Sequence, residues 1–130
     1  MKNKMMVAAL LMVMILTGCG NRVPLKTAYE EADLSSYNNH CIEYGDDWSF
    51  ISIDTNPYDE DYEDCNIHQT MKNVVFDFNQ TLGLPQSVEE RMLQTTWDQG
   101  RQTYKGKEFS VSWTFHPNQG FEVIYEVNNK

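Results

Sequence analysis

Basic residues are scarce in this chain of 130 amino acids, which has 10 lysines and arginines against 19 aspartates and glutamates. Such a negative field repels phosphate backbones and anionic lipid surfaces, so we expect no nucleic-acid partner. A cationic protein, a cationic peptide or a metal ion fits the charge better. An acidic surface can also serve only to keep an exported protein from aggregating.

Motifs of catalysis are also missing. The chain has no nucleophile elbow, no HExxH zinc motif, no P-loop and no glycine-rich dinucleotide fingerprint, and its three histidines lie far apart. Carboxylates are so numerous that two of them can lie close by chance, so their number alone predicts no glycosidase. We therefore expect a protein that is not an enzyme and that needs no cofactor.

Only one long apolar run is present, from Met5 to Leu16, and it follows the two charges of Lys2 and Lys4. As a helix this run is about 18 Å long, against roughly 30 Å for the hydrocarbon core of a bilayer, so it is short for a permanent span. The small residues Thr17 and Gly18 close it. This layout is typical of a secretory signal peptide, and we expect residues 1–18 to be removed.

The tetrapeptide Leu16-Thr17-Gly18-Cys19 resembles the lipobox of bacterial lipoproteins. The resemblance implies that Cys19 receives a diacylglyceryl group and becomes the first residue of the mature protein. Two acyl chains or more hold a protein stably on a membrane. We expect a lipid-anchored protein of the cell membrane or outer membrane that faces away from the cytoplasm. The alternatives are an ordinary cleaved signal that ends near a cysteine and an uncleaved signal anchor.

The mature chain has room for one domain. Without the signal peptide about 112 residues remain, and this length is enough for one modest core. These residues include eight basic and nineteen acidic ones. We expect a lipidated tether over residues 19–26 and a single globular domain over residues 27–130. Thr27 and Glu30 have the spacing of a capping box, which predicts a short helix through Leu34.

Helical periodicity is clearest between Asn66 and Gly83. Apolar residues recur there at steps of three and four, Asn66 is a candidate N-cap and Gly83 a candidate stop. The residues of this apolar face are Ile67, Met71, Val74, Val75, Phe78 and Leu82. A shorter helix is predicted from Ser87, which forms a capping box with Glu90.

Alternation of apolar and polar residues predicts strands. Residues 109–115 and 121–127 form a hairpin around His116-Pro117-Asn118-Gln119-Gly120, while 48–53 and 101–104 supply one or two further strands. The order of elements predicts an α+β fold, in which a small antiparallel sheet packs on one long and one shorter helix. We expect Trp48, Trp97 and Trp113 to fill the core.

The C-terminal half is also similar to small uncharacterised envelope lipoproteins of bacteria. The segments that carry the likeness are the Gly-Leu-Pro link, Gly100-Arg101-Gln102, Ser112-Trp113-Thr114-Phe115-His116-Pro117 and Gly120-Phe121-Glu122-Val123-Ile124-Tyr125. The likeness implies no activity.

Cys41 and Cys65 remain as a pair once Cys19 carries lipid, and an exported domain favours a disulfide between them. Closing the loop between them stabilises by roughly 3 to 4 kcal/mol on the chain-entropy account. Two free thiols are an alternative. A zinc site with His40 and His68 is another, although adjacent residues such as His40 and Cys41 rarely aim at one ion.

The segment between these cysteines is acidic and rich in aromatic residues. Asp59, Asp61 and Glu63 have the first three spacings of a calcium loop, but Asp64 replaces the glycine and Thr70 the glutamate that the pattern requires. A looser Ca²⁺ site and a solvated acidic loop are both open. A loop tied at both ends is a reasonable recognition surface, because restraint lowers the entropy cost of binding. Its candidate residues are Asp54, Asp59, Asp61, Tyr62 and Glu63.

Three functions are consistent with these features. The first is a non-enzymatic binding module, anchored to the membrane by lipid, whose acidic loop and neighbouring sheet edge bind a protein, a peptide or a surface component, with a cationic protein or peptide as the partner that the charge favours. The second is an acidic inhibitor or immunity-type protein that covers a cationic enzyme or toxin. A small cell-wall hydrolase is the least favoured of the three, because the sequence offers no motif for it.

Overall fold

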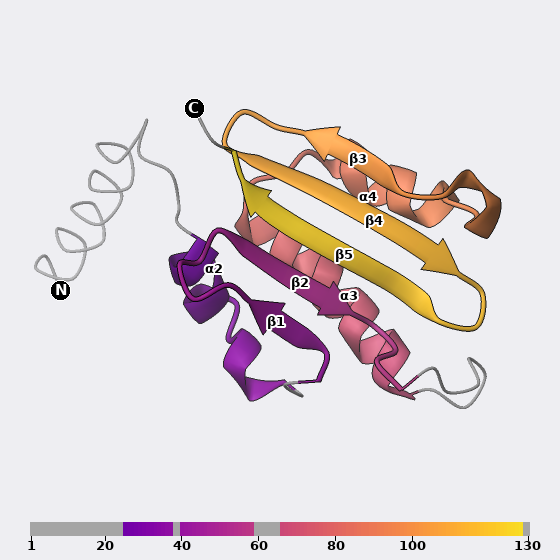
Figure 1. Ribbon diagram of the computed structural model, residues 1–130, viewed down its shortest axis with the longest axis horizontal. Helices are drawn as coiled ribbons and strands as arrows, with labels where there is room; N and C mark the ends of the chain where they lie inside the picture. The colour runs from indigo at the N-terminus through magenta and orange to yellow at the C-terminus, as the bar shows by residue number, and fades with distance from the viewer. Residues whose placement is uncertain (1–24, 38–39, 59–65, 129–130) are drawn as a thin grey trace, which may run out of the picture.

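The computed structural model describes residues 25–37, 40–58 and 66–128, which form one sheet and the helices that cover it (Figure 1). In chain order the elements are α2 (Leu25–Glu31), the 3-10 turn η1 (Leu34–Ser36), β1 (Ile42–Tyr44), β2 (Phe50–Asp54), α3 (Asn66–Thr81), α4 (Gln86–Gln94), the 3-10 turn η3 (Trp97–Gln99), β3 (Gln102–Lys105), β4 (Phe109–His116) and β5 (Gly120–Val127).

All strand pairs are antiparallel, and the strand order is β1-β2-β5-β4-β3. The pairing of β2 with β5 joins the first hairpin to the C-terminal meander, although the two strands are far apart in sequence. In Figure 1, α3 and α4 run behind the sheet and α2 lies at its left end. The predicted α+β class is confirmed, with an antiparallel sheet on the long helix α3 and the shorter helix α4.

Alternation along the strands places one set of side chains against the helices. In β4 and β5 the pattern of apolar and polar residues puts every second side chain in the core, as expected for a half-covered antiparallel sheet. Helix α3 adds the predicted apolar face as far as it is described, because the side chain of Ile67 lies outside the described residues. The buried residues of the strands, of α3 and of the position just after it include Ile51, Ile53, Phe109, Val111, Trp113, Val123, Tyr125, Met71, Val74, Val75, Phe78 and Leu82.

Buried polar contacts fix the helices on the sheet. The Tyr125 hydroxyl donates to Oδ1 of Asn79 at 2.6 Å, and the Tyr125 ring meets Phe78 edge to face with centroids 4.9 Å apart. Burial raises the pKa of Tyr125 well above its usual value, so the phenol stays neutral. The Trp113 indole N–H donates to the Thr95 hydroxyl at 2.9 Å just after α4. Each contact satisfies a group whose burial would otherwise destabilise the fold.

Two opposite ends of the sheet can be defined from these contacts. At the first, which we call the tether end, the backbone N–H of Val127 donates to Ser49 O in the β1–β2 turn, and that of Asn128 donates to Glu108 O before β4. Helix α2 reaches the same end, since Tyr29 contacts Trp48 of that turn with ring centroids 5.2 Å apart. The strands β4 and β5 then run about 26 Å to the other end.

The second end, the loop end, holds the β4–β5 turn together with the residues that follow β2. Thr55 exchanges backbone and side-chain hydrogen bonds with Phe121: Thr55 N–H donates to Phe121 O, and Phe121 N–H donates to the Thr55 hydroxyl, both at 2.9 Å. Asn56 Nδ2 donates to Asn118 O at 2.9 Å. The loop end therefore includes both borders of the segment that holds most of the predicted binding residues.

Several predicted boundaries were wrong. Helix α2 begins at Leu25 and not at a Thr27 cap, and Leu25 is buried, so the last two residues of the expected tether belong to the domain. Helix α4 begins at Gln86 after Pro85, with no side-chain cap, so the predicted capping box at Ser87 does not form. Proline at this position already has the extended backbone from which a helix can start.

Two of the three tryptophans are not fully buried: Trp97 is exposed, and Trp48 is partly buried against the core. Trp97 lies in η3 and is 65% exposed, because α4 ends at Gln94 before the helical spacing reaches it. Trp48 precedes β2 and adopts a left-handed backbone conformation, φ 58°, in the β1–β2 turn. Only Trp113 is fully buried, as predicted. Strand β1 was missed, because three residues are too few for alternation to stand out.

Gly120 is expected to be essential for the loop end. Its φ is +74°, and a Cβ there would collide with the Thr55 hydroxyl and lie 2.7 Å from Nδ1 of His68. We expect Gly120→Ala to lower the free energy of unfolding by about 3 kcal/mol, through left-handed strain and the displaced side chains together. Urea denaturation measures the change.

Gly83→Ala is the matched control for this substitution. Gly83 has a similar φ of +71°, but a Cβ there meets nothing within 4 Å. Backbone strain alone should therefore lower the free energy of unfolding of the Gly83→Ala variant by about 1 kcal/mol. If the free energy of unfolding decreases equally in the two variants, the close packing around Gly120 does not contribute to stability.

Candidate functional site

The side of the sheet away from α3 and α4 carries the polar residues of every strand, and we call it the open face. Antiparallel sheets commonly keep one face toward water. The open face is defined by the strand residues that alternate with the core residues, together with Arg101 before β3: Glu43, Phe50, Ser52, Asp54, Arg101, Thr103, Lys105, Ser110, Ser112, Thr114, His116, Glu122, Ile124 and Glu126.

Carboxylates gather on three neighbouring strands of this face. Glu43 lies on β1, Asp54 on β2, and Glu122 and Glu126 on β5. Asp54 and Glu122 are direct cross-strand partners. Like charges placed opposite one another destabilise a sheet by a few tenths of a kcal/mol or more, so this arrangement does not serve stability. The four residues form what we call the acidic patch.

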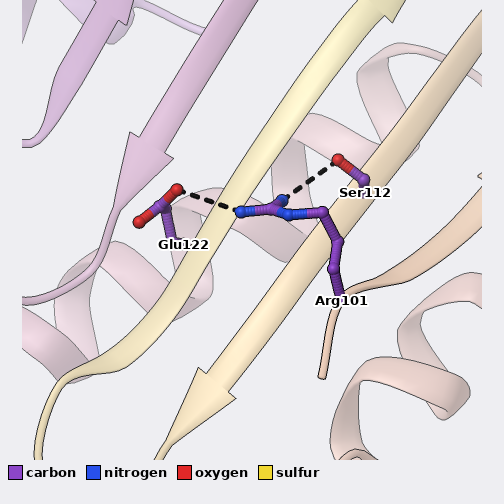
Figure 2. Close-up of polar contacts among 3 residues, drawn as sticks. All are labelled: Arg101, Ser112 and Glu122. Atoms are coloured by element: carbon purple, nitrogen blue, oxygen red, sulfur yellow. Dashed lines mark hydrogen bonds and ion pairs between the residues drawn. The ribbon is translucent and has the colours of Figure 1, made fainter. Parts of the chain in front are cut away.

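Arg101 borders the acidic patch and neutralises part of it. Figure 2 shows its side chain crossing β4, where Nη2 forms an ion pair with Glu122 at 3.1 Å and Nη1 donates to the Ser112 hydroxyl at 3.1 Å. The side chains of Arg101 and Glu122 are 39% and 54% exposed, so the pair contributes at most about 1 kcal/mol. Such a weak pair can open when a partner offers another cation to Glu122.

Two shallow hollows adjoin the acidic patch and share Asp54 and Glu122. The larger, of about 380 Å³, is lined by His40, Cys41, Glu43, Phe50, Ser52, Asp54, Glu122 and Ile124. The smaller, of about 220 Å³, lies at the loop end and is lined by Asp54, Thr114, His116, Gln119, Gly120 and Glu122. Carboxylates and a hydroxyl line each hollow, and the Gln119 amide lines the smaller one, so both offer hydrogen-bond acceptors to a ligand that carries N–H or O–H donors.

The three histidines have separate environments. His68 is fully buried at the start of α3, where Nδ1 lies 2.8 Å from the Thr55 hydroxyl, while the His40 ring lies against Tyr58 with centroids 5.6 Å apart. His116 Nδ1 accepts the backbone N–H of Asn118. Within the described ranges, no three His, Cys, Asp or Glu side chains gather closely enough to hold a metal ion.

Most of the predicted binding loop lies outside the described residues. Of its five candidates only Asp54 is described, and it lies on the open face, where Oδ1 accepts the backbone N–H of Asn56. Asp59, Asp61, Tyr62 and Glu63 are not described, nor are Cys19 and Cys65. Cys41 is buried beneath the larger hollow. The disulfide, the lipid attachment and the Ca²⁺ site therefore stay predictions.

Sequence reasoning missed the residues that complete the acidic patch. Glu122 and Glu126 were predicted only as polar positions of a strand, and Glu43 lies on β1, which the sequence patterns did not predict. The available signal was the alternation itself: residues between core positions of paired strands must share one face. Reading β5 against β2 in register would have placed Glu122 beside Asp54.

No helix within the part of the chain that the structure describes is long and apolar enough to cross a bilayer. Comparisons of the chain with protein-family models, with curated protein sequences and with solved structures found no match.

His68 should make stability depend on pH. Burial, with a smaller contribution from the Lys72 charge, lowers the pKa of His68 below 6.5. The unfolded chain therefore binds a proton first as the pH falls below about 6.5, and the free energy of unfolding should decrease by at most about 1.4 kcal/mol per pH unit until the folded-state pKa is reached. Above pH 6.5 this contribution to stability is complete.

Urea denaturation between pH 8 and pH 5 tests this expectation. The His68→Gln variant, which keeps a hydrogen-bonding side chain beside Thr55, should lose that part of the pH dependence. If wild type and variant lose stability in parallel over this interval, other groups are responsible.

Proposed function

We propose that this protein is a lipid-anchored binding module outside the cytoplasm, whose open face takes a cationic protein or peptide. Lipid on Cys19 attaches the chain to the membrane, and the domain is not an enzyme. The acidic patch on β1, β2 and β5 is the recognition surface, and the observation that carries the proposal is the direct pairing of Asp54 with Glu122 on the open face, the side of the sheet away from the described helices α3 and α4.

The chemistry of the open face supports a cationic partner. Carboxylates accept hydrogen bonds from lysine and arginine, and charge-assisted contacts of this kind are the stronger ones. The hydroxyls of Ser52 and Thr114 lie beside Asp54 and Glu122 and supply further acceptors. Because the mature chain has eight basic residues against nineteen acidic ones, its wider field attracts a cationic partner and raises the rate of association.

The placement of the two ends supports the same proposal. Helix α2, the first described element, reaches the tether end, while Asp54 and the β4–β5 turn lie toward the loop end. A chain attached before Leu25 holds the tether end nearer the bilayer. The smaller hollow then lies at the part of the domain farthest from the membrane, where a partner has access.

Substitution of the acidic patch tests the proposal with a lysine-rich peptide as the probe. We expect the combined variant Glu43→Gln, Asp54→Asn, Glu122→Gln and Glu126→Gln to weaken peptide binding about tenfold, since four exposed charge contacts sum to about 1.4 kcal/mol. Isothermal titration at low and at physiological salt measures the affinity. Wild-type binding should weaken as salt increases.

The control variant removes the same number of charges elsewhere. Glu30→Gln, Glu31→Gln, Asp77→Asn and Glu90→Gln alter four exposed carboxylates on α2, α3 and α4. Net charge is then equal in the two variants, and only location differs. We expect the control to bind nearly as wild type does, whereas equal weakening in both variants would contradict an acidic patch as the binding surface.

A further inference from the structure

Three aromatic side chains contact one another at the tether end and form what we call the aromatic cluster. Tyr44 and Trp48 stack with ring centroids 4.2 Å apart and planes only 6° from parallel. Tyr29 of α2 meets both rings edge-on, with centroids 5.3 and 5.2 Å away. The cluster is accessible, since Tyr44 is 46% exposed and Trp48 is half-buried.

The conformation of Trp48 is costly. Its φ of 58° is in the left-handed region, which disfavours a residue with a Cβ. Glycine is the usual residue at such a turn position. The chain instead keeps an indole here and holds it against Tyr44, so the turn presents a large amphipathic ring at the surface.

Chain length limits how far this cluster can lie from the lipid. Only six residue steps separate Cys19 from Leu25, and a fully extended chain of that length spans about 21 Å. Tyr29 is one helical turn beyond Leu25. With lipid on Cys19, α2 and the aromatic cluster lie within reach of the bilayer, whereas the β4–β5 turn lies a further strand length away.

We propose that the aromatic cluster docks on the headgroup region of the bilayer that carries the Cys19 lipid, and so orients the domain with its loop end away from the membrane. This inference rests on the lipid anchor of the proposed function. Tyrosine and tryptophan favour the interface because one part of each ring system is apolar and another forms hydrogen bonds with water or headgroups.

The lipid anchor makes a weak contact sufficient. Attachment converts docking into an intramolecular step, with an effective concentration in the millimolar range for a short flexible linker. Asp46 and Asp47 flank the cluster, and hydrogen bonds from Ser49 lower the pKa of the Asp47 carboxyl, so it is charged at neutral pH. The docking surface therefore suits zwitterionic headgroups, and anionic lipids should weaken it.

Quenching by brominated lipid tests the proposal in the acylated full-length protein. The Trp97→Phe protein keeps Trp48 and the buried Trp113, while the Trp48→Phe protein keeps Trp97 and Trp113. Trp97 is 65% exposed and follows α4. The start of α4 at Pro85 lies beside Glu108 of the tether end. Arg101, just after Trp97, reaches Glu122 near the other end, so Trp97 lies toward the loop end. The probe is phosphatidylcholine vesicles with bromine on the acyl chains near the headgroups.

We expect the Trp97→Phe protein to lose the Trp48 share of its emission in brominated vesicles, and the Trp48→Phe protein to lose none. Replacing part of the phosphatidylcholine by phosphatidylglycerol should reduce the loss. The Cys19→Ser protein, which has no lipid anchor, gives the reference tryptophan emission of the domain away from the membrane. Co-flotation with the vesicles reports anchoring separately from quenching.

The outcomes separate the two proposals. Protein that floats with the vesicles but shows no quenching of Trp48 keeps its anchor and overturns the docking. Quenching of Trp97 would also overturn it, because the opposite end would then face the bilayer. If Trp48 emission in lipid-free detergent changes with protein concentration, a second copy of the chain covers the aromatic cluster. That result would overturn docking on the membrane. Protein that does not float refutes the anchor, and the docking with it.

Discussion

The packing of the described helices on one face of the sheet is the constraint on which the structure depends. Five antiparallel strands present two faces, and the described helices α3 and α4 pack on one of them. The residues of β4 and β5 then divide by position: every second side chain enters the core, and the others have to be compatible with water. The acidic patch exists because β1, β2 and β5 place carboxylates at positions of the second kind.

Buried hydrogen bonds make this arrangement specific. Hydrophobic packing alone would allow α3 and α4 to shift along the sheet, since it has no direction. The contacts of Tyr125 with Asn79 and of Trp113 with Thr95 form in only one alignment. At the loop end, Thr55 binds both His68 and Phe121, so the start of α3, the end of β2 and the β4–β5 turn hold one another in place.

Sequence patterns predicted the fold class because its strongest signals are local. The face of α3 from Met71 to Leu82 and the two strands of the C-terminal hairpin each repeat over eight or more residues, and all were confirmed. Strand β1 and the boundaries of α2 and α4 depend on contacts distant in sequence or on backbone geometry. No local pattern at Trp97 reveals that α4 ends three residues earlier.

The candidate site was predicted less well than the fold. Asp54 was selected for its place beside the acidic loop, and the structure instead places it on a sheet face with Glu122, a residue 68 positions later. Such a pairing follows from the register of β2 with β5, which joins strands separated by two helices. The environment of Trp48 was predicted only in part for a related reason: its side chain packs against the core but also stacks on Tyr44 at the β1–β2 turn.

Carbodiimide labelling of carboxylates in native envelopes tests the central claim, that a cationic partner covers the open face. Mass spectrometry would compare the labelling of each carboxylate before and after a high-salt wash that releases electrostatic partners. The account predicts that Glu43, Asp54, Glu122 and Glu126 react weakly before the wash and strongly after it, while Asp77 and Glu90 react equally in both. Equal labelling of the acidic patch before and after the wash would contradict it.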